Sequence, residues 1–247
     1  MRRLKILIIM LKLFSRSLEE LENPVEEIKH LIDHTNLRPE ASLSDLEKTC
    51  KEANEYGFYA CCIPPFFVKQ ARQLVRGETK VVTVVGFPHG NSPVEAKELE
   101  VKRAFESGAD EVDAVINISL VRSGRINEAL EEVKRLLEVT RSYGGVLKII
   151  IETGYLEEKT IYEVSKALAA TGVHFVKTST GFGPRGATPE DILIMRDAVK
   201  GTGTKIKAAG GIRTGLQAMY FYLLGVDRIG TSSSLQILSD LKRIFKS

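Results

Sequence analysis

The chain has no tryptophan, three cysteines and four histidines in 247 residues. The cysteines, Cys50, Cys61 and Cys62, are three in number and two of them are adjacent, a pattern that does not indicate a set of disulfide bonds. This usage favours a reducing, cytoplasmic location. No CxxC, HExxH or related zinc-ligand spacing occurs. We therefore expect neither a metal site nor any other cofactor.

The chain also lacks an excess of charge of either sign. It carries 35 Lys and Arg against 32 Asp and Glu, a formal net charge of +3, with the two signs interleaved. A nucleic-acid binder would need a basic patch or stripe, so we expect no nucleic-acid partner. Hydrophobic residues make up 43% of the chain, enough to build a sizeable core.

Long apolar runs are absent except near the N-terminus, over residues 4–14. Lys5 and Lys12 interrupt this run, it is too short to span a membrane, and no small-residue cleavage site follows it. We expect residues 1–23 to form a helical N-terminal extension that packs on the protein or on a second subunit, without a membrane anchor. A signal peptide and a true start at Met10 are the alternatives.

From residue 24 onward, short β-branched runs alternate with helical patterns. Strands are expected at 31–32, 60–63, 81–87, 112–116, 146–151, 175–178, 205–209 and 228–231, and helices at 43–56, 66–75, 94–107, 126–143, 157–170, 189–199 and 214–224. This alternation predicts a parallel sheet, which eight strands close most simply into a single (β/α)8 TIM barrel over residues 24–247. A doubly wound open sheet is the alternative, but its GxGxxG motif is missing, as is a Walker phosphate loop.

Two lysines stand inside apolar strands, Lys177 after Phe175-Val176 and Lys207 after Lys205-Ile206. Burying an ammonium group costs several kcal/mol unless it is paired or deprotonated. On adjacent strands about 4.8 Å apart, the two amines would repel by roughly 4 kcal/mol, which would lower one pKa from about 10.4 to near 7. A neutral lysine amine attacks carbonyl carbon. Alternatively, each lysine neutralises a buried carboxylate or extends to a barrel end.

Asp113 lies between Val112 and Ala114 in another predicted strand. Period-two alternation points its side chain to the opposite face, into the barrel. Imine formation and enamine protonation both need an acid/base group near the reacting carbon, so Asp113 is the candidate. Simple pairing with a lysine is the alternative, and the two readings overlap.

Glycines and hydroxyls follow the last three predicted strands. Gly181 follows the sixth, Gly210-Gly211 the seventh, and the segment 230–234 leads into the last helix. In barrels, the loops after strands seven and eight form a frequent phosphate cradle with a helix N-terminus. Arg213 could add a cationic contact there or simply be solvated.

Taken together, these motifs closely resemble the deoxyribose-phosphate aldolase family, over residues 28–238. The strings that carry the resemblance are Ile32-Asp33-His34-Thr35, Val81-Val82-Thr83-Val84-Val85-Gly86-Phe87-Pro88, Glu111-Val112-Asp113, Lys177-Thr178-Ser179-Thr180-Gly181-Phe182-Gly183, Lys207-Ala208-Ala209-Gly210-Gly211-Ile212-Arg213-Thr214 and Gly230-Thr231-Ser232-Ser233. The resemblance implies a metal-free class I aldolase that reversibly cleaves 2-deoxy-D-ribose 5-phosphate to D-glyceraldehyde 3-phosphate and acetaldehyde. It also implies a homodimer or homotetramer.

The family's residue roles transfer onto matching positions. Lys177 would form the Schiff base, Lys207 would lower its pKa, and Asp113 would act as acid and base through a water. Asp33, Thr35 and Thr180 would contact the sugar. The phosphate-end residues would be Gly181, Gly210, Gly211, Arg213, Gly230, Ser232 and Ser233.

The chain departs from the family pattern in two places. Some relatives carry a lysine where this chain has Phe182, and Arg185 is a candidate to replace that charge. Some relatives also end in a tail with a tyrosine, which residues 243–247 lack. Other Schiff-base aldolases and a non-catalytic sugar-phosphate binder are the competing functions. The former are not expected to carry a second strand lysine, and the latter has no need for a neutral amine.

Overall fold

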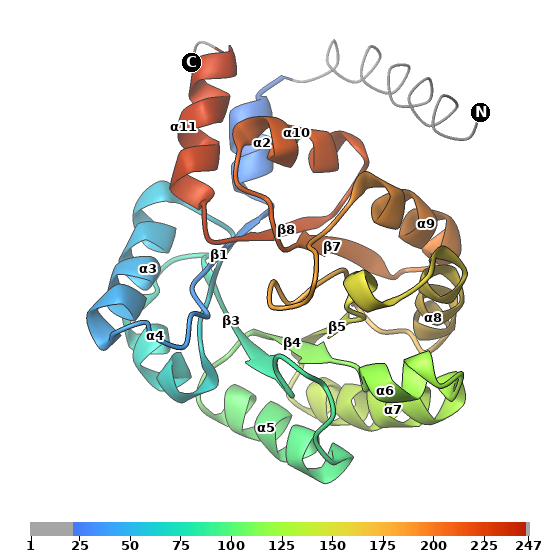
Figure 1. The fold of residues 1–247 in the computed structure, drawn as a ribbon. Helices are drawn as coiled ribbons and strands as arrows, with labels where there is room; N and C mark the ends of the chain where they lie inside the picture. The colour runs from blue at the N-terminus through green and yellow to red at the C-terminus, as the bar shows by residue number, and fades with distance from the viewer. Residues whose placement is uncertain (1–21, 246–247) are drawn as a thin grey trace, which may run out of the picture.

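Eight parallel strands close into a barrel in the computed structural model, which describes residues 22–245 (Figure 1). Each strand pairs with the next along the chain, and β1 pairs with β8 to complete the ring. The strands are β1 Ile32–Thr35, β2 Ala60–Cys62, β3 Lys80–Val85, β4 Glu111–Val115, β5 Val146–Ile150, β6 Phe175–Lys177, β7 Lys205–Ala209 and β8 Arg228–Thr231. The predicted (β/α)8 barrel is confirmed.

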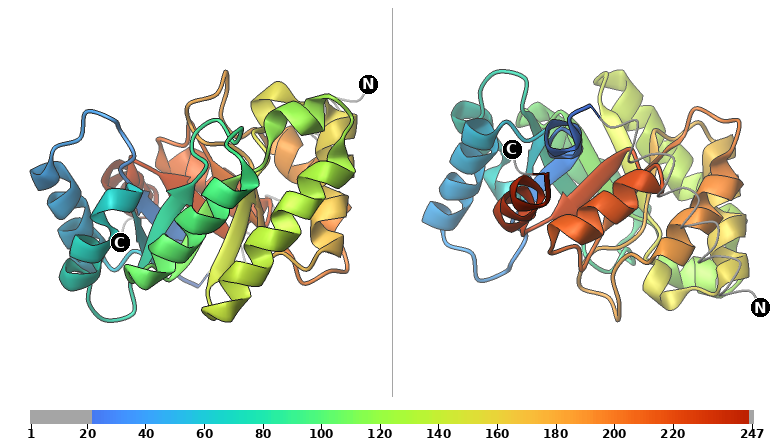
Figure 2. Two further views of the ribbon diagram at one scale, coloured as in Figure 1. Left: turned by 90° about the horizontal axis from the view of Figure 1, so that it is seen from below. Right: turned by 90° about the horizontal axis from the view of Figure 1, so that it is seen from above.

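Helices surround the barrel in Figures 1 and 2. They are α2 Pro24–Lys29, α3 Leu43–Tyr56, α4 Val68–Leu74, α5 Val94–Glu106, α6 Ile118–Arg122, α7 Ile126–Ser142, α8 Glu158–Ala170, α9 Pro189–Val199, α10 Gly215–Leu223 and α11 Ser234–Phe245, with 3-10 turns η1 Pro65–Phe67 and η2 Thr153–Tyr155. Helices α3 and α9 match their predicted bounds. The pattern predicted as one helix over 66–75 divides into η1 and α4. The sequence analysis did not predict α2, α6 or η2.

The first strand is longer than predicted. It runs to Thr35 instead of ending at residue 32, because Asp33 and His34 occupy buried strand positions although both are polar. Nearly all of the predicted N-terminal extension, residues 1–21, lies outside the described residues, so its helical character stays a prediction. Asn23 caps the first described helix by accepting a hydrogen bond from the backbone of Glu26.

The apolar core lies mainly between the strands and the helices, and the inside of the barrel is divided. On the side of β2 and β3, Ala60, Cys62, Val82 and Val84 pack together as an apolar cluster. The other strands direct ionisable side chains inward, among them Asp113, while its strand neighbours belong to the outer core. This division places the charged residues in one half of the barrel interior.

Two loops at the carboxyl ends of the strands approach each other closely. Gly210, with a φ of +87°, follows β7. A Cβ on Gly186 would lie 2.1 Å from the carbonyl oxygen of Gly210, so a side chain cannot be accommodated there. The backbone amide of Ala187 donates to the same carbonyl at 3.1 Å. These contacts fix the loop after β6 against the loop after β7.

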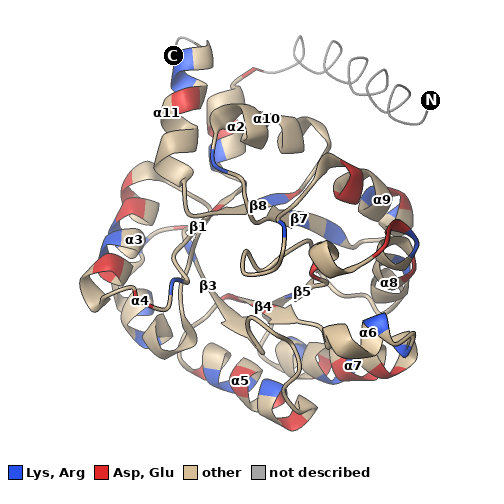
Figure 3. Cartoon of the chain, in the orientation of Figure 1, with Lys and Arg blue, Asp and Glu red and all other residues tan. Residues whose placement is uncertain are grey.

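Most of the outer helices carry residues of both charge signs, whereas α10 carries none (Figure 3). Among residues 22–245, no helix combines the length and the apolar character needed to cross a membrane. The three cysteines are buried and free.

Candidate active site

Seven ionisable side chains meet inside the barrel, none more than 5% exposed. Four are basic and three are acidic, and they come from β1, β4, β5, β6, β7 and β8. They are Asp33, Glu111, Asp113, Lys148, Lys177, Lys207 and Arg228.

Asp113 is the hub of this cluster. Its Oδ2 accepts from Lys177 Nζ and from Lys207 Nζ, both at 2.7 Å, and its Oδ1 accepts from Lys148 Nζ at 2.7 Å. Burial acts to raise the pKa of Asp113, but the three ammonium groups outweigh it and hold the pKa well below the usual value. The predicted inward orientation of Asp113 is confirmed, and so is the predicted proximity of Lys177 and Lys207.

Lys177 differs from the other three bases. Burial is the largest cause that lowers its pKa, and the charge of Lys207 lowers it further, although Asp113 opposes both. In contrast, the carboxylates around Lys148, Lys207 and Arg228 outweigh burial and raise the pKa of each. Lys207 thus acts in the direction predicted from the sequence, but desolvation contributes more to the lowered pKa. Among the four bases of this cluster, Lys177 is therefore the one that most readily loses its proton.

A cavity of about 230 Å³ opens at the carboxyl ends of the strands, where barrel enzymes place their active sites. Lys177 lies in its wall together with loop residues that follow β1, β6, β7 and β8. The lining residues are Thr35, Asn36, Leu37, Arg38, Lys177, Thr180, Gly181, Phe182, Ala209, Gly210, Gly211, Ile212, Arg213, Gly230, Thr231 and Ser232. Most of the predicted sugar and phosphate contacts thus surround one cavity.

Four of the predicted residues do not line it: Asp33, Asp113, Lys207 and Ser233. Asp33 instead pairs with Lys207 and accepts from Arg228 at 2.9 Å. Burial acts to raise the pKa of Asp33, but these cations lower it to about 2. Asp33 is thus a buried anion of the charge cluster, and direct contact with sugar hydroxyls stays a prediction.

The part of the cavity predicted to bind the phosphate has little side-chain bulk. Gly210 and Gly211 have φ values of +87° and +76°, conformations that favour glycine. Beyond Gly230 the chain enters α11, whose first backbone N–H groups have no partner within the helix. Arg213 supplies a cation at the rim.

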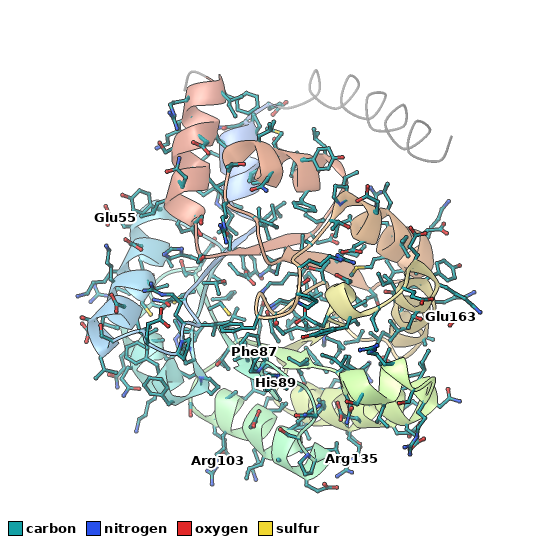
Figure 4. The ribbon with its side chains drawn as sticks, viewed as in Figure 1. Glu55, Phe87, His89, Arg103, Arg135 and Glu163 are labelled. Carbon is teal, nitrogen blue, oxygen red and sulfur yellow. The ribbon has the colours of Figure 1, made fainter. Side chains whose placement is uncertain are left out.

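Arg185 does not replace the missing lysine. Its guanidinium donates to Asp191 at 2.5 Å and to the carbonyl of Thr153 at 3.0 Å, and it does not line the cavity. Phe182 itself is 51% exposed and packs edge-on against Phe87, with ring centroids 5.4 Å apart. Figure 4 labels Phe87 on the loop after β3, directed toward the middle of the barrel mouth.

The sequence analysis missed several members of the site. Lys148, in Val146-Leu147-Lys148-Ile149-Ile150, carries the same signal as Lys177, a lysine within an apolar strand. Arg228 and Glu111 begin their strands and give a weaker signal. Glu152, a buried residue of the loop after β5, accepts from the backbone amide of Thr180 at 3.1 Å and orients that predicted substrate contact.

Comparison with known proteins agrees with this geometry. Residues 28–221 match the model of the DeoC/LacD family aldolases. The chain belongs to this family. It is therefore an aldolase, a carbon–carbon lyase, and the resemblance drawn from its motifs is confirmed.

Similar DeoC/LacD family members include two curated proteins. The chain is 45% identical over 215 residues to the deoxyribose-phosphate aldolase of Thermococcus kodakarensis, covering 86% of this chain and 96% of that one. It is 46% identical over 217 residues to the deoxyribose-phosphate aldolase of Thermotoga maritima, covering 87% and 86%. Among solved structures, the tetrameric deoxyribose phosphate aldolase from Aeropyrum pernix has a TM-score of 0.85 at 32% identity, covering 94% of this chain and 97% of that one.

Proposed function

We propose that this DeoC/LacD family aldolase reversibly cleaves 2-deoxy-D-ribose 5-phosphate to D-glyceraldehyde 3-phosphate and acetaldehyde through a Schiff base on Lys177. The observation that carries the proposal is the position of Lys177. Of the four bases in the barrel cluster it alone lines the cavity, and it alone has a lowered pKa.

Lys177 would begin the reaction as a nucleophile. Its neutral Nζ attacks C1 of the open-chain sugar, and loss of water from the carbinolamine gives an iminium ion. This cation accepts the electron pair when the C2–C3 bond breaks, as the hydroxyl on C3 loses its proton and glyceraldehyde 3-phosphate leaves. Protonation of the resulting enamine at C2 and hydrolysis of the imine release acetaldehyde and restore the amine.

Asp113 would move the protons. Its Oδ2 lies 2.7 Å from Lys177 Nζ, close enough to exchange a proton directly or through one water near the reacting carbon. Lys207 would hold this carboxylate in place and keep a positive charge beside Lys177. These roles follow from the resemblance and from the contacts together.

The cavity walls would orient the substrate. Thr35 and Thr180 line the same cavity as Lys177 and would contact the sugar through their hydroxyl groups. The phosphate would lie against the glycine loops and the start of α11, where backbone N–H groups favour an anion. The residues proposed for this end are Gly181, Gly210, Gly211, Arg213, Gly230, Ser232 and Ser233.

An activity assay tests this function. The purified protein is incubated with 2-deoxyribose 5-phosphate, and both acetaldehyde and glyceraldehyde 3-phosphate are measured, with Lys177→Met as the matched control. We expect equal amounts of the two products from the wild type and none from the variant. Cleavage of a ketose phosphate in preference to the deoxy sugar would identify another Schiff-base aldolase. Binding of the sugar phosphate without products would identify a binder.

We also propose a cytoplasmic homo-oligomer, a dimer or a tetramer. The free, buried cysteines favour a reducing compartment. The related Aeropyrum pernix enzyme is described as tetrameric. Light scattering of the full chain across a dilution series would give the mass, and a monomer at micromolar concentration would contradict the assembly.

A further inference from the structure

We propose that Arg228 and Glu111, at the amino-terminal end of the barrel and away from the substrate cavity, are positioning residues that keep the amine of Lys177 in its neutral, reactive form through a ring of buried ion pairs. This inference rests on the proposed Schiff-base function of Lys177. Neither residue lines the substrate cavity, so any effect on the reaction is transmitted through other side chains.

One half of the ring runs through β8, β1 and β7. Arg228 Nη1 donates to Asp33 Oδ1 at 2.9 Å, and Lys207 Nζ donates to Asp33 Oδ2. Lys207 also donates to Asp113 Oδ2 at 2.7 Å. Positive and negative groups therefore alternate from Arg228, at the amino-terminal end of the barrel, to Asp113, which contacts Lys177.

The other half runs through β4 and β5. Arg228 Nη1 reaches Glu111 Oε2 at 3.3 Å, and Lys148 Nζ lies 2.6 Å from the same oxygen. Lys148 then donates to Asp113 Oδ1 at 2.7 Å and closes the ring. In order, the ring connects Arg228, Asp33, Lys207, Asp113, Lys148 and Glu111, and Glu111 contacts Arg228 again.

Three positive and three negative charges make the ring neutral without Lys177. Lys177 is attached to it at one atom, Asp113 Oδ2, which it shares with Lys207. A charged Lys177 would leave one unbalanced positive charge on a side chain that is only 3% exposed, and a charge with so little solvation is costly. The ring therefore favours loss of the proton from the one base that it does not need.

Other groups on the inner faces of the strands do not change this balance. On β2, burial raises the pKa of the Cys62 thiol to about 11, so it is neutral at pH 7. β3 contributes the apolar Val82 and Val84.

The nearby charges at the two ends of the barrel are exposed or face the substrate cavity. Lys205 at the start of β7 is exposed at the amino-terminal end, and its ammonium lies 5.8 Å from the centre of the Phe175 ring. At the mouth, Arg38 and Arg213 border the substrate cavity and would face the phosphate.

The amino-terminal end of the barrel holds Arg228 in place and is accessible to small solutes. The Arg228 guanidinium lies 3.3 Å from the centre of the Tyr59 ring, and the Tyr59 hydroxyl donates to Glu111 at 3.1 Å. Arg228 and Tyr59 also line a second cavity, of about 730 Å³, on this side of the barrel. A small cation could therefore reach the position of a deleted guanidinium.

Removing one ring charge of each sign tests the proposal. In Arg228→Met the ring loses one positive charge and becomes net negative. Protonation of Lys177 would restore neutrality, so the pKa of Lys177 should rise. The acidic limb of the pH profile of kcat/KM should then move up by about one pH unit, the size expected for a charge several ångströms away. In Glu111→Gln the ring has one uncompensated positive charge, which disfavours protonation of Lys177, so the acidic limb should move to lower pH. The double variant should lie near the wild type.

Chemical rescue separates charge from packing. In Arg228→Ala, guanidinium at tens of millimolar should return the limb toward its wild-type position, whereas urea, a neutral molecule of the same shape, should not. Arg228→Lys keeps the charge and should stay within a few tenths of a pH unit of the wild type. Folded variants whose limbs do not move, or move in the same direction, would overturn the proposal.

A second readout does not depend on turnover. The reaction of Lys177 with acetic anhydride, followed by mass spectrometry across pH, reports the titration of its amine, and it should show the same opposite shifts. If the wild type lacks aldolase activity but the labelling shifts occur, the ring proposal stands and the proposed function fails. If the wild type is active and neither limb nor labelling shifts, the function stands and the ring proposal fails.

Discussion

Lys177 and Lys207 are direct register partners on β6 and β7, and both donate to the same oxygen of Asp113 at 2.7 Å. Their chemistry nevertheless diverges. The pKa of Lys177 is lowered chiefly by burial, whereas that of Lys207 is raised because two carboxylates outweigh its burial. One lysine is thus suited to be a nucleophile and the other a permanent charge.

Replacing Lys207 tests its role as a charge. In Lys207→Leu, the pKa of Lys177 should rise, because a neighbouring positive charge no longer opposes protonation and Asp113 is left to pair with Lys177. At any pH below the raised pKa, a smaller fraction of the amine is neutral. The value of kcat/KM at pH 7 should therefore drop at least tenfold and recover in part toward pH 9–10. A pH–rate profile checks this, with Lys207→Arg as the control that keeps the charge. An acidic limb that stays in place would mean that Lys207 acts by proton transfer or binding instead.

Asp113 should matter for both catalysis and folding. Asp113→Asn removes the anion that accepts from three lysine side chains, and breaking such a buried pairing typically costs about 3–5 kcal/mol. Loss of a general acid/base should also lower kcat by roughly 10²–10⁴-fold. Urea denaturation and kcat measured on the same preparation check the two effects. A variant with wild-type stability would show that the cluster does not depend on this carboxylate.

Phe182 should limit affinity for the phosphate. Phe182→Lys adds a cation at a half-exposed position of the cavity wall, so KM for 2-deoxyribose 5-phosphate should fall by about two- to fivefold, in keeping with an exposed ion pair. KM for unphosphorylated 2-deoxyribose should be unchanged. Phe182→Leu controls for loss of the ring contact with Phe87. Equal changes for both sugars would show that position 182 does not face the phosphate.

Chelators should leave the activity unchanged, because the proposed iminium ion on Lys177 is itself the electron acceptor. Within residues 22–245, no group of three or more His, Cys, Asp and Glu side chains is placed to hold a metal ion. Turnover measured before and after dialysis against EDTA checks this expectation. Activity that is lost to EDTA and restored by zinc would contradict the class I mechanism.

The sequence predicted the barrel and the proximity of Lys177 and Lys207 within it because both rest on local signals. Strand–helix alternation is visible within a few tens of residues, and a lysine within an apolar strand stands out from its neighbours. Lys148 carried the same signal but was passed over, because no glycine turn follows it as one follows Lys177 and Lys207. The criterion of a lysine within an apolar strand, applied without the glycine turn, identifies Lys148 as well.

The rest of the site depends on contacts that no local pattern reveals. Arg228 and Glu111 lie 3.3 Å apart only because closure of the barrel brings β8 and β4 across from each other. Asp33 looked like a sugar ligand by motif, but its two basic partners come from β7 and β8. The sequence could not reveal that burial contributes more than Lys207 to the lowered pKa of Lys177.

Trapping of the Schiff base tests the central claim most directly. The protein is incubated with acetaldehyde or with 2-deoxyribose 5-phosphate, reduced with borohydride, digested and mapped by mass spectrometry. The account predicts a covalent adduct on Lys177, with Lys148, Lys207 and the surface lysines unmodified. An adduct on Lys207 or Lys148, or none in an active preparation, would contradict it.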